Sequence, residues 1–95
     1  MLPLLFDEMY EGKAEEFRKL GYNAVSVREL RDMGFRLQFD YSIISYVFAN
    51  RMILLTRDNE NYGGCMENSI PCVQLGEKPT NEEIFEKLKK FENLP

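Results

Sequence analysis

Four short apolar runs divide the chain into strand-like and helix-like segments. They span residues 2–6, 23–27, 52–56 and 72–75. The first and third are almost wholly apolar, which is typical of strands buried on both faces of a parallel sheet, and the second alternates small with branched side chains. We therefore expect four strands.

Apolar residues between these runs recur at helical spacing. Residues 8–20 predict one helix, which Gly21 would end because glycine is favoured just after a helix. A shorter helix is expected to run to Met33 and to break at Gly34.

The second half of the chain has clearer helix starts and one expected loop. Asp40 is in position to cap a helix, and Thr80 with Glu83 forms the capping-box pattern at the start of a final amphipathic helix. The polar stretch after the glycine pair 63–64 predicts a loop. The aromatic positions expected in the core are Phe17, Phe48, Phe85 and Phe91.

Strands that alternate with helices predict an α/β fold in one domain, residues 1–95. The expected sheet is small, parallel and four-stranded, in the order 2-1-3-4, with helices around it. That order makes the first and third strands neighbours. Ligands of such sheets bind outside the carboxyl ends of the strands, at the point where the strand order reverses.

Carboxylates follow both of these neighbouring strands. Asp7 and Glu8 follow the first, Asp58 and Glu60 follow the third, and Asp40 would join them from the intervening helix. Converging carboxylates repel each other unless they take up protons or bind a hard cation, for which Mg²⁺ and Mn²⁺ are the natural candidates. Such ions support phosphodiester hydrolysis, a chemistry that needs no histidine, and this chain has none.

The same charged residues also have purely structural explanations. Asp40 is explained as an N-cap, and Asp7 and Asp58 as polar residues that start loops. The basic residues nearby would either hold a nucleic-acid backbone or form ordinary surface ion pairs. They are Arg28, Arg31, Arg36 and Arg57.

Net charge and hydropathy narrow the possible functions. A formal charge of −4 argues against a protein that mainly coats nucleic acid, although bound cations would offset the charge of an acidic nuclease site. No apolar run approaches the roughly 20 residues that cross a bilayer, and "MLPLLF" lacks the basic start of a secretion signal. We expect a soluble cytoplasmic protein, and its small size favours a homodimer.

Two cysteines are the only sulfhydryl groups. Cys65 and Cys72 are expected to be structural thiols, with a disulfide as the first alternative. A zinc site is the second alternative, and without histidine it would need carboxylates or another subunit to complete it.

Four segments carry a resemblance to a known family. They are "LLFDE", "LGYNAVSVREL", "DYSIISYVFANRMILLTRDNE" and "CVQLG". Together they resemble the small PIN-like family, compact relatives of the PIN-domain ribonucleases found as toxins in toxin-antitoxin operons. The resemblance covers nearly the whole chain, and its most specific part is an Asp that opens a helix followed by a strand ending in Thr-Arg-Asp.

The resemblance implies an RNA substrate, Mg²⁺ or Mn²⁺ as cofactor, and an antitoxin protein as partner. It makes Asp7, Asp40 and Asp58 the catalytic and metal-binding acids. The family pattern Thr-Arg-Asp-x-Asp-Phe is altered here, because Glu60 replaces the second Asp and Asn61 with Tyr62 stands where Phe is expected. Glu60 is kept as a fourth metal ligand. The residues expected in support are Glu8, Thr56, which would orient a carboxylate or contact phosphate, and Arg57.

Three functional hypotheses follow. The first is a metal-dependent ribonuclease, a toxin of a toxin-antitoxin pair. The second is a catalytically inactive PIN-like module that binds RNA or a protein partner. The third is a receiver-like domain phosphorylated on Asp58, and it ranks last because the sequence shows neither a fifth strand nor a suitably placed lysine.

Overall fold

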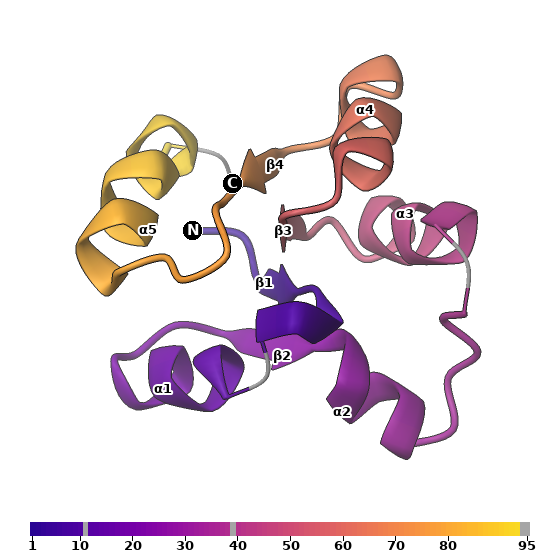
Figure 1. Ribbon diagram of the computed structural model, residues 1–95, viewed down its shortest axis with the longest axis horizontal. Coiled ribbons are helices and arrows are strands. Elements are labelled where there is room, and N and C mark those ends of the chain that lie inside the picture. Colours follow the sequence, from indigo (N-terminus) through magenta and orange to yellow (C-terminus); the bar gives the residue numbers. More distant parts are fainter. Residues whose placement is uncertain (11, 39, 94–95) are drawn as a thin grey trace.

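The computed structural model describes residues 1–10, 12–38 and 40–93. Its centre is a parallel four-stranded sheet in the order β2-β1-β3-β4, as predicted (Figure 1). The strands are β1 (Leu4–Phe6), β2 (Ala24–Ser26), β3 (Ile53–Thr56) and β4 (Cys72–Gln74), each at or inside its expected limits. No fifth strand occurs in these ranges, so the receiver-like hypothesis gains no support.

Helices cover both faces of this sheet (Figure 1), and each helical layer packs on the sheet through its own apolar cluster. On one face α1 (Lys13–Lys19) and α5 (Asn81–Leu88) cover the side chains of alternate strand residues such as Leu4 and Phe6. On the other face α2 (Val27–Asp32), α3 (Asp40–Ala49) and α4 (Asn59–Glu67) cover Leu5 and Leu54. This double coverage explains why the central strands β1 and β3 are buried at every position.

The predicted helix over residues 8–20 is divided in two. A 3-10 turn, η1 (Glu8–Tyr10), precedes α1, and Gly12 at the start of α1 has a φ of 91°. This left-handed conformation, which glycine adopts at little cost, turns the chain between the two pieces. Gly21, with a φ of 98°, follows the end of α1, as expected.

The loop predicted after the glycine pair begins only at Asn68, because α4 occupies Asn59–Glu67 and includes both glycines. Asp58 caps this helix, which offsets the poor helix propensity of glycine. Gly64 has a packing role. A Cβ on residue 64 would lie 2.3 Å from Ile44 Cδ1, so the missing side chain lets α4 lie close against α3.

The aromatic core is only partly as predicted. Phe17 is fully buried, and Phe85 and Phe91 are half-buried against the same layer. Phe48 was expected in the core, but it is 69% exposed, because the buried face of α3 is formed by Ile43 and Val47. A helix that packs through one narrow stripe leaves the residue next to that stripe in solvent.

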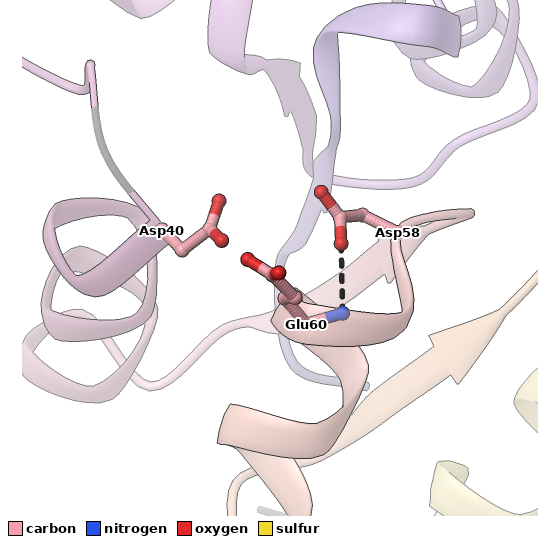
Figure 2. A group of neighbouring side chains, drawn as sticks. All are labelled: Asp40, Asp58 and Glu60. Atoms are coloured by element: carbon pink, nitrogen blue, oxygen red, sulfur yellow. Dashed lines mark hydrogen bonds between the residues drawn. The ribbon is translucent and has the colours of Figure 1, made fainter.

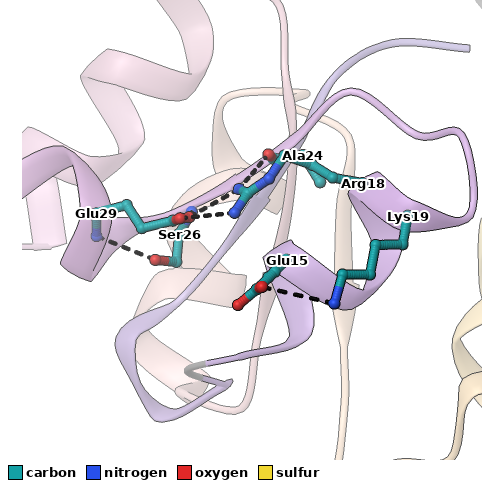
Figure 3. Close-up of polar contacts among 6 residues, drawn as sticks. All are labelled: Glu15, Arg18, Lys19, Ala24, Ser26 and Glu29. Carbon is teal, nitrogen blue, oxygen red and sulfur yellow. Dashed lines mark hydrogen bonds and ion pairs between the residues drawn. The ribbon is translucent and has the colours of Figure 1, made fainter.

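The carboxyl end of β2 is fixed by polar contacts (Figure 3). Ser26 Oγ accepts from Glu29 N–H at 3.0 Å while Glu29 Oε1 accepts from Ser26 N–H at 2.9 Å, a complete capping box at the start of α2. The Arg18 guanidinium binds both oxygens of Glu29 and donates to the Ala24 carbonyl, and this pairing lowers the pKa of Glu29. A surface pair, Glu15 and Lys19, lies on the outer side of α1.

The start of α5 agrees with the sequence prediction, since Thr80 Oγ1 accepts from Glu83 N–H at 3.1 Å. A 3-10 turn, η2 (Lys89–Phe91), follows this helix. Throughout the described ranges, the helices are too short or too polar to span a membrane.

Candidate metal centre

Three carboxylates converge at the carboxyl edge of the sheet. Asp40 is the first residue of α3, Asp58 directly precedes α4, and Glu60 lies in the first turn of α4. One oxygen from each lies within 4.8 Å of the others. Figure 2 shows the Asp40 side chain pointing from α3 toward the other two. We call these three residues the acidic cluster.

Asp58 is held by its role as a helix cap. Its Oδ1 accepts from Glu60 N–H at 2.7 Å (Figure 2) and, more weakly, from Asn61 N–H at 3.4 Å. A carboxylate at a helix N-terminus is also favoured by the helix dipole. The cap therefore fixes the carboxylate of Asp58 and places Glu60 beside it. Asp40 was predicted to be the N-cap of its helix, but it is the first residue of α3, and the position before it, residue 39, lies outside the described residues.

Electrostatic repulsion is visible at Glu60. Its pKa is raised above the ordinary 4.5, first by a hydrogen bond with Asp40 and then by the negative charges of Asp40 and Asp58. A raised carboxyl pKa in an exposed side chain means that its neighbours disfavour its negative charge. Proton uptake is one way to relieve this repulsion, and cation binding is the other.

Asp7 lies apart from the acidic cluster. The residue is 3% exposed. Its Oδ1 accepts from Glu8 N–H at 2.8 Å, and its Oδ2 accepts from Thr56 Oγ1–H at 2.6 Å and from Asn61 Nδ2–H at 3.0 Å. Asp7 is not among the grouped acids of the described chain, and its role as a metal ligand stays a prediction.

Thr56, the last residue of β3, connects Asp7 to the acidic cluster. It is fully buried, and its hydroxyl donates to Asp7 while accepting from Asp58 N–H at 3.0 Å. One hydroxyl thus links the carboxyl end of β1 to the cap of α4. An apolar side chain of the same shape would provide neither bond.

Asn61 is the residue that sequence reasoning missed. It is 2% exposed, and its Nδ2 donates to Asp7 while its Oδ1 has no hydrogen-bond partner among the described residues. The signal that could have found it is its spacing. Asp58 is a residue type favoured as an N-cap, and the third residue after a cap lies in the first turn of the helix.

The expected supporting and basic residues have varied surroundings. Glu8 forms an ion pair with Arg31, which also donates to the Leu37 carbonyl at 2.7 Å. Arg57 is exposed. Burial raises the pKa of Tyr10 to about 12, an effect that the positive charge of Arg57 opposes and the negative charge of Asp7 reinforces.

The two cysteines are free thiols buried in the core, as predicted. Hydrogen bonding with Cys65, followed by burial, raises the pKa of the Cys72 thiol. Among the described residues the acidic cluster is the only group of possible metal ligands, and neither sulfur belongs to it.

The donor set of the acidic cluster fits a hard divalent cation. Three carboxylate oxygens, two of them from half-buried residues and one from an exposed residue, are accessible and carry charge that a cation would neutralise. Comparison with protein-family models, with curated proteins and with solved structures finds no match to this chain.

Proposed function

We propose that the protein is a ribonuclease that hydrolyses RNA phosphodiester bonds with Mg²⁺ or Mn²⁺. The observation that carries this proposal is the acidic cluster at the carboxyl edge of a parallel sheet, where such folds bind their ligands. The resemblance of the sequence to the small PIN-like family supports the choice of RNA as substrate.

Asp40, Asp58 and Glu60 would hold the cation. A bound Mg²⁺ or Mn²⁺ supplies an activated water and neutralises charge on the leaving oxygen. The chain contributes a fixed carboxylate at Asp58, held by the α4 cap, and two neighbours that approach it from different helices. The resemblance adds Asp7 as a catalytic acid. The Thr56 hydroxyl links it to Asp58, because this hydroxyl donates to the Asp7 carboxylate and accepts from Asp58 N–H.

Cation binding is tested without any choice of RNA. We expect Mn²⁺ titration by calorimetry to show saturable binding that is lost in Asp58→Asn, a change that keeps a good N-cap residue. The matched control is Asp32→Asn, which removes an exposed aspartate from α2. Equal Mn²⁺ affinity in the wild type and in Asp58→Asn would overturn the assignment.

Cleavage is the second test. The wild type should cleave RNA in the presence of Mn²⁺ and stop when the cation is chelated, and Asp58→Asn should be inactive while it remains folded by circular dichroism. Full cleavage by that variant would contradict the proposed site.

A second candidate function is a catalytically inactive module that binds RNA or a protein partner. It is favoured by large apolar side chains that are exposed on α3 and α4: Tyr41 at 70%, Phe48 at 69% and Met66 at 61%. An antitoxin or a second copy of the chain would cover such a surface. If this function is correct, Phe48→Ser weakens partner binding or dimerisation, and Asp58→Asn leaves both unchanged.

A further inference from the structure

Asn61 has a polar side chain at a buried position. Its Oδ1 has no hydrogen-bond partner in the part of the chain that the structure describes, and the residue is 2% exposed. A buried carbonyl oxygen without a partner destabilises the folded state, and an unpaired buried group in a native protein calls for an explanation. The Nδ2 group of the same amide provides this explanation, because it donates to Asp7 at 3.0 Å.

The hydrogen bonds around Asn61 form a closed ring. Its Nδ2 donates to Asp7 Oδ2, which also accepts from Thr56 Oγ1–H. Thr56 Oγ1 accepts from Asp58 N–H, and Asp58 Oδ1 accepts from the backbone N–H of Asn61. The ring therefore begins and ends at Asn61.

This hydrogen-bonded ring of Asp7, Thr56, Asp58 and Asn61 joins three elements. It connects the residue after β1, the last residue of β3 and the first turn of α4. Asp58 is its only member that also belongs to the acidic cluster. The ring can therefore affect the geometry of the acidic cluster only through the position of Asp58.

We infer that Asn61 is a positioning residue for the acidic cluster. Its amide holds Asp7, and the closed ring holds the Asp58 carboxylate at the distance from Asp40 and Glu60 that cation binding requires. The inference rests on the proposed function for its link to cations, while the ring itself is independent of any ligand. Residues that orient metal ligands from behind are needed for affinity although they do not touch the ion.

The first test replaces Asn61 by leucine, which has a similar size and no amide. In Asn61→Leu we expect Mn²⁺ affinity to fall roughly 10- to 100-fold, the usual effect of losing such a partner. If Asp7 were simply a ligand restrained by Asn61, releasing it would leave the affinity unchanged or raise it, and that result would overturn the inference.

The matched control is Cys65→Ala, which destabilises the same helix, α4, by removing buried volume one helical turn further on. It should lower stability, as Asn61→Leu does, and keep the wild-type Mn²⁺ affinity. An equal loss of affinity in both variants would show that Asn61 acts only through stability and would contradict a positioning role.

A double-mutant cycle tests the pair directly. Asp7→Asn and Asn61→Leu should each weaken Mn²⁺ binding, and the double variant should lose less than the sum of the two losses, because both changes break the same contact. Simple addition of the two losses would contradict the pairing.

Hydrogen exchange provides a readout without metal. In the wild type the backbone amide of Asp58 and the side-chain amide of Asn61 should be protected, and in Asn61→Leu the Asp58 amide should exchange faster while core amides of β1 do not. Rapid exchange of both wild-type groups would overturn the ring. Absence of Mn²⁺ binding by a wild type with protected amides would instead contradict the proposed function alone.

Discussion

The two neighbouring strands β1 and β3 are each followed by an aspartate, and the two aspartates have opposite surroundings. Asp7 is buried and accepts three hydrogen bonds from N–H and O–H donors. Asp58 faces the carboxylates of Asp40 and Glu60. A buried carboxylate with donors is stable without a cation, whereas a carboxylate among carboxylates gains from one. The difference separates an acid that organises the site from acids suited to bind a ligand.

The largest expected effect is on stability, in Asp7→Ala. This change leaves the Thr56 hydroxyl and the Asn61 amide buried without their acceptor. We expect the free energy of unfolding to fall by about 3 kcal/mol, as measured by urea denaturation. Asp32→Ala, at an exposed site on α2, should change it by less than about 0.5 kcal/mol. Equal changes in the free energy of unfolding for Asp7→Ala and Asp32→Ala would contradict a structural role for Asp7.

The next effect concerns the link between the two aspartates, in Thr56→Val. The variant keeps the shape of the side chain and removes the hydroxyl that binds both Asp7 and the Asp58 amide. We expect a loss of about 2 kcal/mol in the free energy of unfolding, because the residue is fully buried. The matched change Thr80→Val, at the exposed cap of α5, should cost about 1 kcal/mol. An equal or larger loss at Thr80 would contradict a special role for Thr56.

The acidic cluster should respond in the opposite direction. In Asp40→Asn, without metal, we expect the free energy of unfolding to rise by about 0.5 kcal/mol at low salt, since one of three like charges is removed. High salt should abolish this gain by screening. A variant that is less stable than the wild type at low salt would show that the interaction of Asp40 with the helix dipole in the first turn of α3 outweighs the repulsion.

The smallest effect is a pH dependence. The folded-state pKa of Glu60 is raised above the ordinary 4.5, so the folded state holds the proton more tightly than the unfolded state does. The resulting stabilisation is fully present below pH 4.5 and is lost as the pH rises through the raised folded-state value. Thermal unfolding of the wild type and Glu60→Gln across this range isolates the effect, and parallel curves would contradict it. Mn²⁺ should raise the wild-type melting temperature more at pH 7 than at pH 4.5.

The sheet could be predicted from the sequence because its signal is local. The apolar runs at 2–6 and 52–56 can be stable only between two helical layers, and the alternation of strands with helices leads to a parallel order. Helix α4 was missed for a physical reason. Its two glycines have poor helix propensity, and the contact with Ile44 that makes Gly64 useful exists only after α3 and α4 have packed together.

The fold class and the set of acids near one edge of the sheet could be predicted from the sequence alone. These follow from hydrophobic periodicity and from residue types at strand ends, which are local properties of the chain. The division of these acids into two groups arises from tertiary packing. Asp7 meets Thr56 and Asn61, while Asp58 meets Asp40 and Glu60. Which donor or carboxylate lies opposite an oxygen depends on how β1, β3, α3 and α4 pack, and residues as distant as Asp7 and Asn61 come into contact only through that packing.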